Sequence, residues 1–242
     1  MMKAYNHTSK LALITLSLTT LALSACSTTG GYNYTNLKDE RSNRIAKLIS
    51  RESLSQEPSS SLETLESRFK NAPESEYAAT EYAIALRKAA KYSEARKVLK
   101  DLAENKEATA PTKTEYAAIL IEEEKIDQAV KVAKQATLTD ENYDMAFMVL
   151  GTALEIQEEH EDAEKAFRKA LELWHGDKTT IMSTLALNLA SQKRLNDAIE
   201  ILQEAKALQP EKTEIERNLR IVMALKQSDG AQAPKPLTKP KI

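Results

Sequence analysis

This sequence of 242 residues has one cysteine and three histidines, the residue types most often used as nucleophiles or metal ligands. The single cysteine, Cys26, follows an apolar segment, and one thiol cannot form an intramolecular disulfide. His160 lies in the acidic run EEHED (158–162), where carboxylates and an imidazole are potential metal ligands. A metal site needs several ligands that face one point, whereas an acidic turn between two helices is more often solvated. His175 is expected to lie in a turn.

No catalytic constellation can be assembled from the remaining residues. The sequence has no glycine-rich phosphate loop, no Ser/His/Asp set and no cysteine nucleophile in its body. The formal net charge of −2 argues against nucleic acid, which favours a concentrated basic surface. We therefore expect no enzyme and no site for a metal, a small-molecule substrate or a cofactor, apart from a lipid joined covalently to Cys26.

The first 25 residues have the parts of a secretory signal peptide. Lys3 and Lys10 give a positive flank without acids, residues 11–23 are apolar or hydroxyl-bearing, and two small residues precede Cys26. The apolar segment is shorter than the roughly 20 residues of a transmembrane helix. The alternatives are an ordinary signal peptide with a chance cysteine, or a short membrane anchor.

The tetrapeptide Leu-Ser-Ala-Cys (23–26) resembles the bacterial lipobox. The resemblance implies that residues 1–25 are cleaved, that Cys26 receives diacylglycerol, and that the new amino group often receives a fatty acid such as palmitate. Two or three acyl chains hold a protein stably on a membrane, whereas one holds it only marginally. Ser27 at the next position, in place of Asp, implies transfer to the outer membrane with the body facing the periplasm. Residues 26–36 are polar and predict a flexible tether.

The rest of the chain has a helical composition and an internal repeat. Gly and Pro number only five and seven, and no alternating runs of β-branched residues occur. The pattern Ala-x3-apolar-x2-Ala recurs, most clearly in the runs 163–170 and 198–205. Counting back from the first Ala of each run gives four units, 76–109, 110–143, 144–178 and 179–212, whose starts are 34, 34 and 35 residues apart.

Each unit resembles the tetratricopeptide (TPR) pattern of two helices joined by a turn. A small residue that lets two helices approach closely occupies the same place in every unit: Ala83, Ala117, Gly151 and Ala186. Large residues form a stripe that the next hairpin covers, so that several hairpins must stack. The resemblance implies an all-α fold, a right-handed superhelical stack of about four TPR helical hairpins with capping helices.

The segments that flank the four units are expected to cap the stack. Residues 37–75 predict N-terminal helices and a degenerate half-unit, with Leu62, Leu65 and Phe69 on one face. Residues 213–227 repeat the first-helix pattern without a second helix and predict a capping helix. Residues 228–242 are rich in Pro and Lys, and we expect a disordered tail.

The first helices of TPR hairpins line a concave groove, which places a candidate partner-binding site on about the second, fifth, ninth and twelfth residues of each unit. These residues are Tyr77, Thr80, Ile84, Arg87, Thr114, Ala118, Ile121, Met145, Met148, Thr152, Glu155, Ser183 and Leu187. An adaptable apolar strip within the set consists of Ile121, Met145, Met148 and Leu187. Such a strip suits a partner helix or an extended peptide. The alternative is that these side chains pack between the repeats as core. The set of Lys and Asn residues that chaperone-binding relatives use to clamp a carboxylate is missing.

The C-terminal runs LALNLASQKRLNDAIEIL (185–202) and ERNLRIVMAL (216–225) are similar to the C-terminal part of TadD, the TPR lipoprotein of the tight-adherence (Flp) pilus system. This resemblance implies an outer-membrane lipoprotein that acts as a scaffold in assembly of a pilus or secretion system, pilotin-like for the secretin. Its partner would be the secretin or another pilus-assembly component. The alternative function is a periplasmic TPR adaptor lipoprotein that scaffolds cell-wall hydrolases or another envelope complex.

Overall fold

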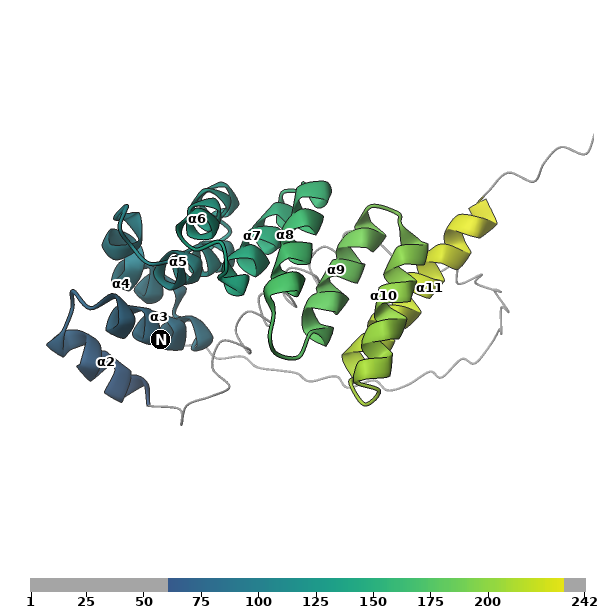
Figure 1. Ribbon diagram of the computed structural model, residues 1–242. Helices are drawn as coiled ribbons and strands as arrows, with labels where there is room; N and C mark the ends of the chain where they lie inside the picture. The colour runs from purple at the N-terminus through teal and green to yellow at the C-terminus, as the bar shows by residue number, and fades with distance from the viewer. Residues whose placement is uncertain (1–60, 233–242) are drawn as a thin grey trace, which may run out of the picture. The chain divides into compact units, whose positions relative to one another are not determined.

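The helical periodicity of the sequence is realised throughout the part of the chain that the computed structural model describes, residues 61–232 (Figure 1). These residues form ten helices and no strand, which confirms the expected all-α fold. The helices are α2 (Leu62–Asn71), α3 (Glu76–Lys88), α4 (Tyr92–Glu104), α5 (Ala110–Glu122), α6 (Ile126–Thr139), α7 (Asp144–Ile156), α8 (His160–Leu173), α9 (Thr179–Ser191), α10 (Leu195–Leu208) and α11 (Thr213–Gln232). The expected signal peptide, Cys26, the expected tether and the segment before α2 lie outside the described residues.

Consecutive helices pack as hairpins, and the hairpins stack (Figure 1). The pairs α3–α4, α5–α6, α7–α8 and α9–α10 are the four hairpins, and each second helix also packs against the first helix of the next hairpin. First helices contact one another from α3 to α5, from α5 to α7 and from α9 to α11. Among the described helices, α7 and α9 are the neighbouring first helices that do not pack closely in this way.

The turn inside each hairpin contains one residue in the left-handed conformation, and none of these residues is glycine. They are Ala90 (φ 58°), Glu124 (φ 60°), Glu158 (φ 67°) and Lys193 (φ 62°). In the first turn the N–H of Ala90 donates to the carbonyl of Arg87, and the N–H of Lys91 donates to that of Leu86, both at 2.9 Å. This Schellman pattern recurs in all four turns and satisfies carbonyls left free at the end of the first helix. The turns are therefore defined by their backbone hydrogen bonds and not by glycine.

The core is built where the two helices of a hairpin cross. Its members include Leu86 and Leu99 in the first hairpin and Leu202 in the last, all fully buried. In the third hairpin the crossing pairs Gly151 with Phe167, whose ring is also fully buried. A Cβ atom at position 151 would lie only 2.6 Å from Phe167 Cε1. Glycine is needed here because the phenylalanine ring fills the space that a methyl group occupies in the other hairpins.

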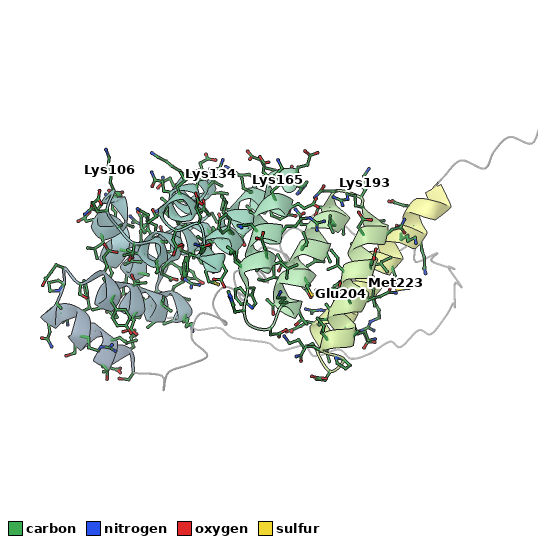
Figure 2. All side chains as sticks on the ribbon, viewed as in Figure 1. Lys106, Lys134, Lys165, Lys193, Glu204 and Met223 are labelled. Carbon is green, nitrogen blue, oxygen red and sulfur yellow. The ribbon has the colours of Figure 1, made fainter. Side chains whose placement is uncertain are left out.

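The outer face of the second helices is charged and solvated. Lys134 on α6 and Lys165 on α8 are exposed, and both side chains project away from the stack (Figure 2). Each second helix thus has one apolar stripe directed inward and a polar surface directed outward, which is the amphipathic pattern of a surface helix.

The two ends of the described stack differ from its middle. At one end α2 packs against α3, with the rings of Phe69 and Tyr82 stacked at a centroid distance of 5.6 Å. At the other end α11 buries Ile215 and Val222, whereas Met223 is 42% exposed (Figure 2). No second helix follows α11 in the described residues. The helix continues to Gln232, and the expected tail from residue 228 is wrong for its first residues.

Candidate partner-binding surface

The thirteen residues proposed from the sequence all lie on the first helices α3, α5, α7 and α9. Most of them are buried: Thr80, Arg87, Thr114, Ala118, Ile121, Met148, Thr152, Glu155 and Ser183. The members that keep accessible surface are Tyr77, which is 67% exposed, and the half-buried Ile84, Met145 and Leu187. The surface that a partner could contact without a rearrangement is therefore narrower than the sequence pattern suggested.

The expected apolar strip is divided by this burial. Ile121 and Met148 belong to the hydrophobic core, at 7% and 4% exposure. Met145 and Leu187 pack against that core from its edge. The expectation that Ile121 and Met148 form part of an exposed strip is thus wrong. Their side chains lie between helices, because α5 stacks against α3 and α7. Whether Met145 and Leu187 bind a partner stays a prediction.

A buried ion pair joins the first two hairpins. Arg87 on α3 donates from Nε to Glu115 Oε1 at 2.5 Å and from Nη2 to Oε2 at 2.9 Å, with side chains 1% and 7% exposed. Burial acts to lower the pKa of Arg87, but the charge and hydrogen bonds of Glu115 outweigh it and raise that pKa. Beside the pair, Thr80 and Thr112 share a buried hydrogen bond of 3.0 Å. Arg87 is therefore a structural link between α3 and α5 and not a free groove residue.

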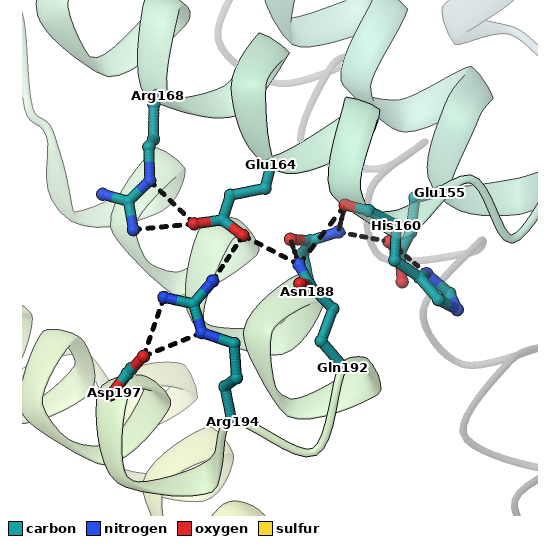
Figure 3. A network of polar contacts seen from close by, with 8 residues as sticks. All are labelled: Glu155, His160, Glu164, Arg168, Asn188, Gln192, Arg194 and Asp197. Atoms are coloured by element: carbon teal, nitrogen blue, oxygen red, sulfur yellow. Dashed lines mark hydrogen bonds and ion pairs between the residues drawn. The ribbon is translucent and has the colours of Figure 1, made fainter.

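A polar network replaces direct packing between α7 and α9 (Figure 3). Glu155 near the end of α7 accepts hydrogen bonds from Asn188 Nδ2 at 2.6 Å and from Ser191 Oγ at 3.0 Å, both on α9. His160 Nδ1 lies 2.9 Å from Glu155 Oε2, and the His160 carbonyl accepts from Asn188 at 2.9 Å. The third and fourth hairpins are thus joined by directional contacts that require a particular orientation.

The same network continues onto the second helices (Figure 3). Glu164 on α8 accepts from Gln192 at 3.0 Å and from Arg194 at 2.7 Å, and it also pairs with Arg168 at 2.8 Å. Arg194 in turn pairs with Asp197 at 2.7 Å. Burial acts to raise the pKa of Glu164, but the hydrogen bonds from Gln192, Arg168 and Arg194 outweigh it, so that the pKa is lowered. Glu164 is therefore held as a carboxylate at this junction.

The acidic turn at 158–162 borders a surface pocket of about 680 Å³, which Gln192 and Arg194 close on the other side. His160 is already engaged with Glu155. Among residues 61–232 no group of three or more His, Cys, Asp or Glu side chains is placed to hold a metal ion. The pocket lies beside the network and offers solvated carboxylates, without a nucleophile and base set for acyl or phosphoryl transfer.

Sequence reasoning missed the charged and amide partners of these junctions. Glu115 and Asn188 were not selected, because a single charged or amide residue on a helix resembles ordinary surface. The signal that could have found them is the unit register: the twelfth place of the first and third units holds Arg87 and Glu155, where the other units have Ile121 and Ala190. A charge at a place that is apolar in sister repeats indicates a buried partner in a neighbouring repeat.

Residues 61–232 include no helix that is both long enough and apolar enough to cross a membrane.

Comparison with known families and structures agrees with this architecture. The family model for the tetratricopeptide repeat protein 21 C-terminal ARM domain matches residues 33–220. No curated protein matches the chain.

Solved TPR structures share the fold at low sequence identity. A thermophilic TPR protein of Thermus thermophilus is 18% identical with a TM-score of 0.59, and the match covers 77% of this chain and 99% of that one. YrrB, described as a TPR protein with an unusual peptide-binding site, is 15% identical with a TM-score of 0.53, over 76% and 89% of the two chains. MamA from Desulfovibrio magneticus RS-1 is 17% identical with a TM-score of 0.53, over 74% and 97%. These likenesses establish the stack of helical hairpins.

Proposed function

Because the chain belongs to the family of the tetratricopeptide repeat protein 21 C-terminal ARM domain, we propose that it is a non-catalytic scaffold that binds a protein partner on its first helices. The observation that carries this proposal is the stack of four hairpins, in which the first helices α3, α5 and α7 pack side by side and a polar junction joins α7 to α9. Tyr77, Ile84, Met145 and Leu187 supply accessible apolar surface on that side. Apolar and aromatic side chains of this kind dominate the energetics of protein interfaces.

An extended peptide or a helix of a partner is the ligand class that fits this side. Met145 is flexible and polarisable, which suits an adaptable surface. The peptide-binding site described for YrrB, a protein of similar fold, makes a peptide a reasonable first ligand to test. Arg87 and Glu155 are engaged in junctions between hairpins, so specificity would rest on shape and apolar contacts more than on free charges.

The proposed location is the outer membrane, through a lipid on Cys26, with the repeats in the periplasm. The support is the tetrapeptide Leu-Ser-Ala-Cys at 23–26 after an apolar segment, together with Ser27. Cys26→Ser should stop labelling by fatty acid and release the protein from membrane fractions. Persistent labelling of the Cys26→Ser protein would overturn the lipid assignment, and Ser27→Asp should move the wild-type anchor to the inner membrane.

For the partner we propose a component of a tight-adherence (Flp) pilus, with the secretin as the first candidate and a pilotin-like role in its assembly. The support is the similarity of the runs 185–202 and 216–225 to TadD-like lipoproteins. Loss of the gene should then lower the amount of secretin multimer in outer-membrane fractions, and restoring the gene should restore it. Unchanged multimers would refute the pilotin-like role.

The binding surface is tested by photo-cross-linking inside cells from a photoreactive residue at Met145, which keeps accessible surface, and not at the buried Met148. Leu138 on the second helix α6 is 78% exposed and provides the matched control. Capture of a pilus component from position 145 but not from 138 supports the proposal. Capture of cell-wall hydrolases alone would replace it with the hydrolase-adaptor function, and equal capture from both positions would refute the first-helix surface.

A further inference from the structure

Helix α2 has the place of a second helix, and no first helix for it lies among the described residues. In the four hairpins the twenty-fourth residue of the unit is fully buried: Leu99, Ala133, Phe167 and Leu202 are all at 0% exposure. The residue one repeat earlier, 34 positions before Leu99, is Leu65 on α2, and it is only half-buried. Leu65 thus has the residue type of a hairpin core without the cover that such a residue receives elsewhere.

The remaining apolar residues of α2 show the same incomplete cover. Leu62 and Phe69 are half-buried and pack against the edge of the core, and Phe69 meets Tyr82 of α3 through one ring face. Among the described helices, α2 packs chiefly against α3, which is the first helix of the next unit. Among the described residues, no helix covers the side of α2 on which its own first helix would lie.

The sequence before α2 carries a first-helix pattern in the correct register. Stepping back one repeat of 34 residues from Glu76 leads to residue 42. The apolar residues Ile45, Leu48 and Ile49 then fall at the places of Ala79, Tyr82 and Ala83, the stripe with which α3 packs.

The start of α2 departs from this register. α4 begins at Tyr92, which corresponds to residue 58, whereas α2 begins four residues later, at Leu62. Ser61, at the place of the fully buried Ala95, is exposed and caps α2 by accepting a hydrogen bond from the Thr64 N–H. The family match begins before α2, at residue 33.

We propose that residues 42–54 dock on α2 as the first helix of a fifth hairpin. The connection to α2 would comprise residues 55–61, seven residues against the three of the turn 89–91 between α3 and α4. This occupant is favoured over a partner helix or a second copy of the chain, because so short a connection gives an effective local concentration in the millimolar range. Docking covers Leu65 and adds one more first helix beside Tyr77.

The fifth hairpin also limits the distance between the anchor and the beginning of the scaffold. If Cys26 carries the lipid, as the proposed function holds, residues 27–41 alone separate it from the first helix. Fifteen residues span at most about 50 Å when fully extended. The start of the first helix therefore stays within that distance of the membrane.

Cysteine cross-linking tests the docking directly. The full chain carrying Cys26→Ser receives Ile49→Cys with Leu65→Cys, the places that in the third hairpin are in contact as Gly151 and Phe167. The control pair is Arg51→Cys with Leu65→Cys, because Arg51 lies about 200° further round the same helix. Intramolecular disulfide formation in the first pair and not in the second supports the fifth hairpin. Equal formation in both pairs, none in the first, or a covalent dimer would overturn it.

A second measurement does not depend on Leu65. Leu48→Asp should lower the midpoint of thermal unfolding by several degrees, whereas Lys47→Asp on the opposite face should leave it unchanged. Hydrogen exchange in the Cys26→Ser chain should show residues 42–54 as protected as α2. Rapid exchange there, or equal effects of the two Asp substitutions, would refute the docking. None of these readouts depends on a pilus partner, so they can fail while the proposed function stands.

Discussion

The crossing of α7 and α8 offers the sharpest test of the packing. A methyl group added at Gly151 would lie 2.6 Å from Phe167 Cε1, 2.7 Å from Cδ1 and 3.0 Å from Cζ. Gly151→Ala should improve helix propensity by about 1 kcal/mol. Overpacking a rigid core costs typically about 1–3 kcal/mol. The ring of Phe167 is fully buried, and all three of these distances are at or below 3.0 Å, so the upper part of that range applies. We expect a net loss of roughly 1–2 kcal/mol in the free energy of unfolding.

Two of the other hairpins carry alanine at the place of Gly151 together with a smaller residue at the place of Phe167. The first and fourth hairpins pair alanine with leucine at this crossing, as Ala83 with Leu99 and Ala186 with Leu202. Phe167→Leu alone should destabilise the protein because it leaves a cavity. The double variant Gly151→Ala with Phe167→Leu recreates the sister pair. It should therefore be more stable than the sum of the two single effects, by roughly 1–2 kcal/mol.

Urea unfolding followed by helical circular dichroism measures all three variants. Ala186→Gly provides the control for helix propensity, because the same place in the fourth hairpin has no aromatic ring opposite it. A neutral or stabilising Gly151→Ala, or additive effects in the double variant, would show that the ring is not the constraint and would refute this account.

Three further predictions concern the turns and the junctions. Ala90→Gly should stabilise the protein by roughly 1 kcal/mol, because alanine at φ 58° is strained, whereas Ala89→Gly at φ −81° should destabilise it; thermal unfolding compares the two. Glu115→Gln should cost about 3–5 kcal/mol by leaving Arg87 charged and buried. Replacing both residues by leucine should cost less, and urea midpoints that rank the two variants the other way would contradict the buried pair. The lowered pKa of Glu164 stabilises the fold fully above the ordinary pKa of 4.5, and this stability is lost as the pH falls through the lowered value. Glu164→Gln should therefore weaken the loss of stability in acid, as measured by urea unfolding at a series of pH values; an unchanged pH dependence would contradict the assignment.

The hairpin stack could be derived from the sequence because the residue pattern that produces it is short and recurs in every repeat. Two helices that cross closely need a small residue at the crossing, and alanine or glycine therefore returns once per repeat, as at Ala83 and Gly151. What the sequence pattern did not contain was the size of the residue opposite. Gly151 is required by Phe167, sixteen residues later, and only the packed structure relates the two.

The turns were unpredictable in detail for a different reason. A left-handed residue at a helix end is usually signalled by glycine. Here the four positions hold Ala, Glu, Glu and Lys, so composition gave no indication of the conformation. The conformation follows from the two hydrogen bonds of each Schellman turn, together with the angle at which the second helix must return to bury its stripe.

The junctions explain why only some of the candidate binding residues keep accessible surface. Counting places along a first helix identifies the side that faces the groove, but it cannot show how closely the next first helix approaches. Between α5 and α7 the approach is close, and Met148 is enclosed. Between α7 and α9, where the repeat is one residue longer, Glu155 reaches across to Asn188 instead. Apolar contacts tolerate sliding, whereas these hydrogen bonds fix one relative orientation of the third and fourth hairpins. This polar junction therefore sets the placement of Met145 relative to Leu187. The affinity of a partner that binds both residues would depend on the orientation that the junction fixes.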